Sequence, residues 1–326
     1  MRFIIYGAGA VGSVIGGRIH QHVASHGHGV VLVARGAHRD AIHANGLTIN
    51  DPAGTVVLDV PVVAHIAEAE PRRGDVVVMS MKTQDSRHAL DELARVAPDV
   101  AVACAQNGVE NERLALRQFA GVYGICVILP ATFMEPGVVD ASGAPHNAIL
   151  DVGRYPSGTD ATSQLIASTF DLSGLVSEST PRVMDLKYAK LLMNLGNSID
   201  ALVADRENIG DLLHRARDEA TRCFLAAGIS WTTDEADRER RHGVMEMRPI
   251  AGRPRFGGST WQSLARGATT TEVDWLNGEI VLLGRTHGVE TPVNAMLCAI
   301  TREAVARGAT PRSLTAAELI ERLPKP

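Results

Sequence analysis

A glycine-rich string near the N-terminus is the first feature with the composition to do chemistry. Gly7-Ala8-Gly9-Ala10-Val11-Gly12 follows an apolar, strand-like run and opens a helix-like segment. In such a unit the first glycine permits a tight turn, the second lets the backbone approach a pyrophosphate, and the third allows close packing of helix on strand. The N-terminus of the helix also attracts an anion. We therefore predict that these six residues bind a dinucleotide: Gly7, Ala8, Gly9, Ala10, Val11 and Gly12.

The residue at the end of the second strand-like run indicates which dinucleotide is bound. NAD-preferring enzymes carry an acidic residue there, which binds the ribose hydroxyls, whereas this chain has Arg35. A guanidinium can pair bidentately with a 2′-phosphate and stack on adenine. The sequence therefore predicts NADP(H) as the cofactor and Arg35 as a cofactor-binding residue, with Arg39 as a rival for the same contact.

A second set of polar side chains lies along a helix that we predict over residues 184–204. At about 100° per residue, Lys190, Asn194 and Asn197 fall within about 60° of one another. The opposite side of the helix carries large aliphatic residues: Leu192, Leu195, Ile199 and Leu202. The Lys and Asn stripe is therefore expected to face something polar, either a ligand or plain solvent.

Four further stretches, together with the glycine string, resemble the ketopantoate reductases (2-dehydropantoate 2-reductases). Their order and spacing match that family over most of the chain. The stretches are residues 81–84 (MKTQ), 106–108 (QNG), 188–194 (YAKLLMN), and Ser259-Thr260 followed by residues 271–278 (TEVDWLNG). The resemblance implies an oxidoreductase of pantothenate biosynthesis that reduces 2-dehydropantoate to pantoate with NADPH.

The resemblance implies two catalytic residues. Lys190 corresponds to the lysine that protonates the alkoxide as hydride reaches the ketone carbon, and Glu272 to the glutamate that hydrogen-bonds the hydroxyl end of the substrate. A cationic donor suits this chemistry, because ketone reduction places negative charge on oxygen. A nearby second cation, for which Lys82 is the candidate, would lower the lysine pKa from its ordinary value of about 10.4, whereas Glu272 would oppose that shift. Lys187, one turn before Lys190, is the alternative acid.

The resemblance also implies where substrate and cofactor bind. Asn194 matches a substrate-binding asparagine, and Ser259 or Thr260 matches a serine that helps to hold the carboxylate. Lys82 and Asn107 match residues at the cleft where cofactor and substrate meet.

Two departures from the family pattern bear on the substrate. Pantoate-specific members often have a second substrate-binding asparagine eight residues after the lysine, where this chain has Ser198 beside Asn197. Trp261-Gln262-Ser263 follows the Ser-Thr pair, where the family more often has a Met-Leu-Gln-Asp type of run. Ketopantoate is therefore the leading substrate, and another branched or smaller 2-keto acid remains open.

The predicted elements that position these residues are alternating strands and helices in the first half of the chain and helices alone in the second half. Val- and Ile-rich runs at residues 3–6, 30–33, 75–80, 100–105 and 124–129 alternate with helix-like segments. Continuous apolar runs are typical of strands covered on both faces, as in a parallel sheet built from βαβ units.

From about Pro181 onward the segments read as helices, over residues 184–204, 212–227, 270–286 and 293–307. We predict an α/β fold, with a Rossmann-type NADP-binding domain over residues 1–180 and an all-helical substrate and catalytic domain over residues 181–326. Residues 232–255 are rich in charge, Pro and Gly, and we expect an exposed or mobile loop whose role the sequence does not reveal.

Composition limits the class of protein further. The chain of 326 residues has a net charge of −5 and 45% hydrophobic residues. This balance gives no electrostatic reason to expect a nucleic-acid or anionic-membrane partner. No run reaches the ~20 apolar residues of a membrane span, and the N-terminus lacks the features of a signal peptide, so we expect a cytoplasmic protein. The scattered histidines and the four separated cysteines indicate no metal site.

The sequence as a whole predicts NADPH-dependent reduction of a 2-keto acid supplied as a small-molecule substrate. A related dehydrogenase acting on another keto acid or an opine-type substrate is one alternative, and a non-catalytic NADP-sensing protein is another. The sequence does not determine the oligomeric state, and a homodimer is one assembly that it allows.

Overall fold

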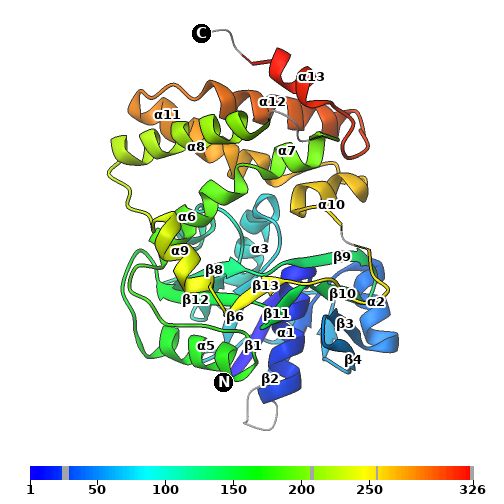
Figure 1. Cartoon of the computed structure of the whole chain (residues 1–326). Coiled ribbons are helices and arrows are strands. Elements are labelled where there is room, and N and C mark those ends of the chain that lie inside the picture. Colours follow the sequence, from blue (N-terminus) through cyan, green and yellow to red (C-terminus); the bar gives the residue numbers. More distant parts are fainter. Residues whose placement is uncertain (24–28, 206–208, 255, 324–326) are drawn as a thin grey trace. The chain divides into compact units, whose positions relative to one another are not determined.

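The computed structural model describes residues 1–23, 29–205, 209–254 and 256–323 (Figure 1). Its contacts divide the chain into two compact units. The first comprises Met1–Lys187 and Thr233–Arg255, and the second comprises Tyr188–Thr232 and Phe256–Pro326. The division therefore falls inside helix α6 (Val183–Asn194) rather than at residue 180, and the chain returns to the first unit near residue 233.

A seven-stranded sheet lies at the centre of the first unit, in the order β12-β8-β7-β6-β1-β2-β5. All neighbours in it are parallel except β12, which runs antiparallel to β8. The predicted parallel-sheet domain is thereby confirmed. The strands are β1 (Arg2–Tyr6), β2 (Gly29–Val33), β5 (Val62–Val63), β6 (Val76–Met79), β7 (Ala101–Cys104), β8 (Val122–Ile128) and β12 (Ile149–Arg154).

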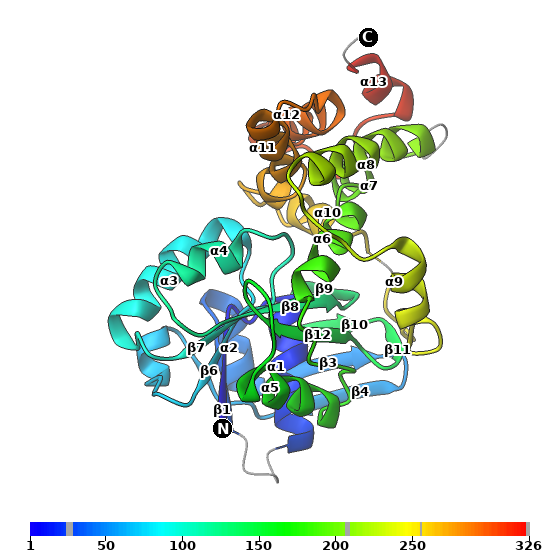
Figure 2. The ribbon, with the colours of Figure 1, turned by 90° about the vertical axis from the view of Figure 1, so that its left-hand side faces the viewer.

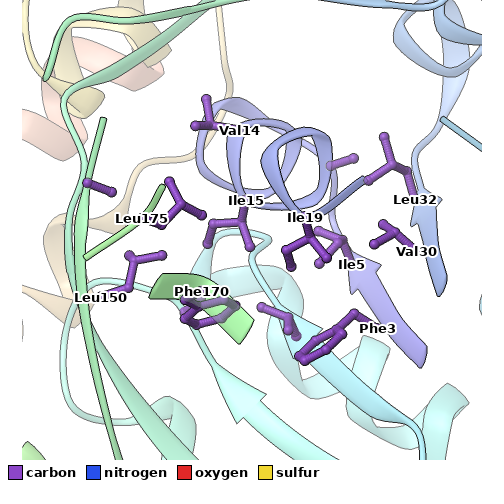
Figure 3. Close-up of a cluster of buried hydrophobic side chains, with 14 of the residues drawn as sticks. Phe3, Ile5, Val14, Ile15, Ile19, Val30, Leu32, Leu150, Phe170 and Leu175 are labelled. Atoms are coloured by element: carbon purple, nitrogen blue, oxygen red, sulfur yellow. The ribbon is translucent and has the colours of Figure 1, made fainter. Parts of the chain in front are cut away.

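Helices cover both faces of this sheet, with α1 and α5 on one face and α3 and α4 on the other (Figure 2). Successive side chains of a strand point to opposite faces and so pack against different helices. Phe3 and Ile5 of β1 pack with α1 and α5, whereas Ile4 and Tyr6 pack with α3 and α4. Figure 3 shows Ile19 of α1 beside Ile5, and Ile15 of α1 beside Leu175. The helical elements that begin in this unit are α1 (Ala10–Val23), α2 (Gly36–Asn45), η2 (Ile66–Ala69), α3 (Thr83–Val96), α4 (Asn111–Leu116), α5 (Ala161–Leu172), α6 and α9 (Asp234–Arg241).

Helix α1 is also packed against a second, four-stranded sheet that the sequence did not predict. Its order is β4-β3-β10-β9. Gly16 faces Leu32 of the main sheet, and Gly17 faces Ile49 of the second sheet, so closely that a Cβ at either position would collide. Two adjacent glycines therefore let one helix approach two sheets. The strands are β3 (Leu47–Asp51), β4 (Gly54–Leu58), β9 (Ala131–Glu135) and β10 (Val138–Ala141).

The charged segment expected as a loop over residues 232–255 is instead tied to the first unit. It contains α9 and β13 (Met245–Met247), which pairs antiparallel with β11 (Gly143–Pro145). Arg240 Nη2 donates to Asp151 Oδ1 at 2.7 Å, and Arg253 Nε donates to Asp140 at 3.1 Å. Both carboxylates are buried and therefore need such partners. The segment is exposed, as expected, and α9 has no buried residue. It is not a loop, however, because it forms a helix and a strand and its arginines bind distant carboxylates that the sequence does not show.

The second unit is helical, as predicted, but two of its expected helices are interrupted. The stretch 184–204 breaks at Gly196 into α6 and α7, and the stretch 270–286 begins as the 3₁₀ turn η3 before α11. Aliphatic side chains from α7, α8, α12 and α13 form its core. The elements are α7 (Asn197–Leu202), α8 (Ile209–Ala226), α10 (Ser259–Ala265), η3 (Glu272–Trp275), α11 (Asn277–His287), α12 (Pro292–Ala306) and α13 (Ala316–Glu321).

The described residues contain neither a membrane-spanning helix nor a cluster of metal ligands. Within them, no helix combines the length and the apolar character needed to cross a membrane. The same residues form no group of three or more His, Cys, Asp and Glu side chains placed to hold a metal ion. The four cysteines are buried thiols.

Candidate active site

The carboxyl ends of four neighbouring parallel strands bring the predicted cofactor-binding residues to one edge of the main sheet. Tyr6 of β1 is in register with Val33 of β2 and Met79 of β6, and Met79 is in register with Cys104 of β7. The loops that follow these strands carry the glycine turn, Arg35, Lys82 and Asn107. Open α/β sheets bind dinucleotides outside this edge.

The turn after β1 has the shape that a pyrophosphate needs. Gly7 has φ +98°, and a Cβ there would collide with the backbone of Met81. A Cβ on Gly12 would collide with Ser80, whose hydroxyl donates to the carbonyl of Gly7 at 3.0 Å. Among the described residues, by contrast, nothing lies within 4 Å of the position that a Cβ on Gly9 would take. The turn is therefore held tightly on two sides and open at its middle glycine, beside the N-terminus of α1, so its residues fit a dinucleotide.

Arg35 lies two residues after the end of β2 and immediately before α2, with 60% of its side chain exposed. Its Nη2 is 3.4 Å from Oε2 of Glu92, on α3. The phenol of Tyr6 donates to the same oxygen at 2.5 Å, and this hydrogen bond is the main cause that lowers the pKa of Glu92. Arg39, the rival for the cofactor contact, pairs with its neighbour Asp40. Glu92 was not predicted from the sequence, because only the fold brings α3 beside Arg35.

A buried network of polar side chains holds the loops that carry Lys82 and Asn107. Asn111 Nδ2 donates to Thr83 Oγ1 at 3.1 Å and to the carbonyl of Asn107 at 3.4 Å. The network also links Ser86 to Asn111 at 2.7 Å and Gln106 to Ser86 at 2.9 Å. Lys82 and Asn107 are themselves half-buried. The network therefore fixes the first turn of α3 relative to the loop after β7.

Lys187 is buried in the first unit, and its ammonium group is fully engaged there. Its Nζ is 2.5 Å from Oε1 of Glu112, which is itself fully buried, and donates to the carbonyls of Gln106 at 3.0 Å and Cys104 at 3.4 Å. The ammonium group, which has three donors, therefore has one carboxylate oxygen and two carbonyl oxygens around it. Burial raises the pKa of Glu112, and the charge of Lys187 opposes that rise. This environment indicates a structural lysine, which leaves Lys190 as the better candidate for the acid.

Lys190 and Asn194 lie four residues apart on α6, in the second unit, and so share one face of the helix. Lys190 is half-buried. Asn194 is 5% exposed, and its Nδ2 has no hydrogen-bond partner in the part of the chain that the structure describes. A buried donor without a partner costs about 1–3 kcal/mol. The side-chain amide of Asn194 is therefore available to donate a hydrogen bond to a ligand.

The break at Gly196 separates Asn197 and Ser198 from the helix that carries Lys190. A single helical stripe from Lys190 to Asn197 was therefore a wrong expectation. Ser198 is buried, and its hydroxyl donates to Oδ1 of Asn277 at 3.2 Å. Asn277 in turn donates to the carbonyl of Leu195 and to Asn294. Ser198 thus has a structural contact that the sequence did not show, and the half-buried Asn197 remains the better candidate for a ligand contact.

The other predicted substrate-binding residues open α10 and η3. The amide of Gly258 donates to Asp200 Oδ2 at 2.9 Å, which ties the start of α10 to α7. Ser259 is half-buried, and Thr260 is 4% exposed. The second unit therefore brings the Ser-Thr pair and Asn197 onto neighbouring helices. Glu272 begins η3 as a buried carboxylate, 7% exposed.

The chain matches one known family over both of its halves. A family described as "Ketopantoate reductase PanE/ApbA" matches residues 3–156, and its C-terminal part matches residues 182–305. Curated relatives named 2-dehydropantoate 2-reductase include one from Pyrococcus horikoshii, 28% identical over 93% of this chain and 97% of that protein. Another, from Halobacterium salinarum, is 28% identical over 93% of this chain and 98% of that protein.

Solved structures show the same fold. A PanE/ApbA family ketopantoate reductase from Ralstonia eutropha JMP134 has a TM-score of 0.77 and 25% identity, and covers 94% of this chain and 99% of that one. D-Mandelate dehydrogenase in a complex with NADH and anilino(oxo)acetate has a TM-score of 0.78 and 22% identity over the same shares of the two chains.

Proposed function

Because this chain belongs to the ketopantoate reductase PanE/ApbA family, we propose that it uses NADPH to reduce a 2-keto acid to a 2-hydroxy acid. The leading substrate is 2-dehydropantoate, because the curated relatives are named 2-dehydropantoate 2-reductase. The observation that carries the proposal is the shape of the turn after β1, which is tightly packed at Gly7 and Gly12 and open at Gly9. This turn lies at the carboxyl edge of the main sheet, where the loops after β2, β6 and β7 carry the other predicted cofactor-binding residues.

The first unit alone supplies the proposed contacts to the nucleotide. The glycine turn and the N-terminus of α1 would hold the pyrophosphate, and Arg35 would bind the 2′-phosphate. Lys82 and Asn107 would lie at its nicotinamide end, held there by the buried network around Asn111. When bound, the cofactor supplies the hydride.

The second unit supplies the groups for the keto acid. Lys190 would donate a proton to the oxygen that becomes the hydroxyl, and its positive charge would stabilise the developing alkoxide. Asn194 would donate its unpartnered amide to the substrate. Asn197 with Ser259 or Thr260 would hold the carboxylate, and Glu272 would accept a hydrogen bond from a substrate hydroxyl.

Oxidation of the cofactor, followed by its absorbance, tests this function directly. We expect purified protein to reduce 2-dehydropantoate with NADPH faster than it reduces 2-keto acids that lack the 4-hydroxyl. A higher rate with an unrelated 2-keto acid would keep the reaction type and change the substrate. Binding of NADPH without turnover on any keto acid would contradict the enzymatic proposal and support a cofactor-sensing protein.

Replacing Arg35 by alanine is expected to weaken NADPH binding about 10- to 100-fold and NADH binding less than about 3-fold. The difference arises because a charge-assisted bidentate contact to the 2′-phosphate contributes about 1.5–3 kcal/mol, and NADH lacks that phosphate. Dissociation constants from the quenching of protein fluorescence measure both effects. Arg39→Ala, four residues later and paired with Asp40, is the matched control. Equal losses for both nucleotides in Arg35→Ala would remove the assignment.

A further inference from the structure

Glu92 is an unassigned carboxylate placed beside the residue that would bind the 2′-phosphate. It lies on the third turn of α3, 57 residues from Arg35 in sequence, with Oε2 at 3.4 Å from Nη2 of Arg35. The groups that face it are Tyr6 from β1, Arg35 from the loop after β2, and His88 one turn earlier on α3, with His65 contributing a weaker charge interaction.

The position of Glu92 is set by the core rather than by solvent. Tyr6 is 3% exposed, and its phenol donates to Oε2 of Glu92 at 2.5 Å. The Glu92 side chain is 20% exposed, compared with 60% for Arg35. This hydrogen bond also lowers the pKa of the carboxyl, so that Glu92 is ionised at neutral pH. Glu92 is therefore an anchored anion, whereas Arg35 is the partner that is able to move.

An anchored carboxylate and a 2′-phosphate would compete for the same guanidinium. Arg35 cannot present its full set of donors to a phosphate while one terminal nitrogen pairs with Glu92. The phosphate carries nearly two negative charges at neutral pH, so a fixed negative charge next to its site also opposes binding. NADH has a ribose hydroxyl in place of this phosphate. Its binding is therefore opposed neither by competition for Arg35 nor by repulsion from the carboxylate of Glu92.

We propose that Glu92 is a positioning residue that sets cofactor preference. By pairing with Arg35, it weakens NADPH binding and so reduces the ratio of the affinities for NADPH and NADH. This inference rests on the proposed role of Arg35 in binding the 2′-phosphate. Tyr6 is part of the same device, because it keeps the carboxylate in place.

The test measures dissociation constants for NADPH and NADH by protein fluorescence, without any substrate. Glu92→Gln keeps the size of the side chain and removes its charge, and we expect it to tighten NADPH binding about 5-fold and to change NADH binding less than 2-fold. In the Arg35→Ala background the same replacement should change NADPH binding less than 2-fold. Weaker or unchanged NADPH binding in Glu92→Gln, or a parallel change for NADH, would overturn the inference.

A matched control separates this contact from a general change in charge. Asp91→Asn alters the net charge equally on the adjacent residue of α3, but Asp91 lies near Arg87 and Gln118 rather than Arg35. We expect Asp91→Asn to leave both dissociation constants unchanged. If Arg35→Ala weakens NADPH and NADH equally, the cofactor proposal itself fails. If Arg35→Ala acts on NADPH alone and Glu92→Gln does nothing, only the role of Glu92 fails.

Discussion

Replacing Lys190 by alanine is expected to lower kcat for keto-acid reduction by about 10²- to 10⁴-fold, while the dissociation constant for NADPH changes less than about 3-fold. A positioned general acid contributes a factor of this size. Cofactor binding should survive, because the proposed contacts to the nucleotide are made by the first unit, whereas Lys190 belongs to the second. Steady-state kinetics with saturating NADPH measure the first effect, and fluorescence titration measures the second.

The conservative variant Lys190→Arg separates the charge of this residue from its proton. Arginine keeps the positive charge but does not give up a proton near neutral pH. We expect Lys190→Arg to remain at least 10-fold below the natural protein in kcat. Unchanged turnover in Lys190→Ala would contradict the assignment and move the acid role to Lys187 or Lys82.

Replacing Lys187 by methionine is expected to destabilise the protein by about 3–5 kcal/mol and to lower its melting temperature by about 6–20 °C. The variant leaves Glu112 without its counter-charge in a site where the carboxylate is fully buried. Breaking a buried ion pair from one side typically costs this much, and one kcal/mol corresponds to about 2–4 °C in a unit of this size. Thermal unfolding followed by circular dichroism measures the change.

The double variant Lys187→Met with Glu112→Met removes both charges and should recover most of the lost stability. An apolar pair of similar volume often equals or exceeds a buried ion pair. Arg87→Met is the control, since its pair with Asp91 is solvent-exposed and should be worth less than about 1 kcal/mol. If the double variant is stable but as inactive as Lys190→Ala, Lys187 acts in the chemistry, and our structural interpretation of it is wrong.

Sequence reasoning was most accurate where the signal is local to the chain. The continuous apolar runs predicted five strands of the main sheet, β1, β2, β6, β7 and β8, but not the edge strands β5 and β12. The glycine string predicted the strand–turn–helix unit. Both signals depend on the conformational preferences of adjacent residues. The same reasoning missed the second sheet, whose short strands pair across long separations, with Thr48 of β3 beside Val138 of β10. It also extended one helix through Gly196, whereas α6 ends at Asn194 and α7 begins at Asn197.

The sequence by itself determined the fold class, the two kinds of unit and the residue types available for binding a nucleotide and reducing a ketone. Only the tertiary structure decided which of the candidate side chains have structural partners. Lys187 donates to carbonyls 81 and 83 residues away in the sequence, and Ser198 donates to an asparagine 79 residues away. Spacing along one helix does not show which distant groups surround a lysine, such as the buried glutamate beside Lys187. Burial and charge pairing depend on which distant segments meet, and that is a property of the folded chain.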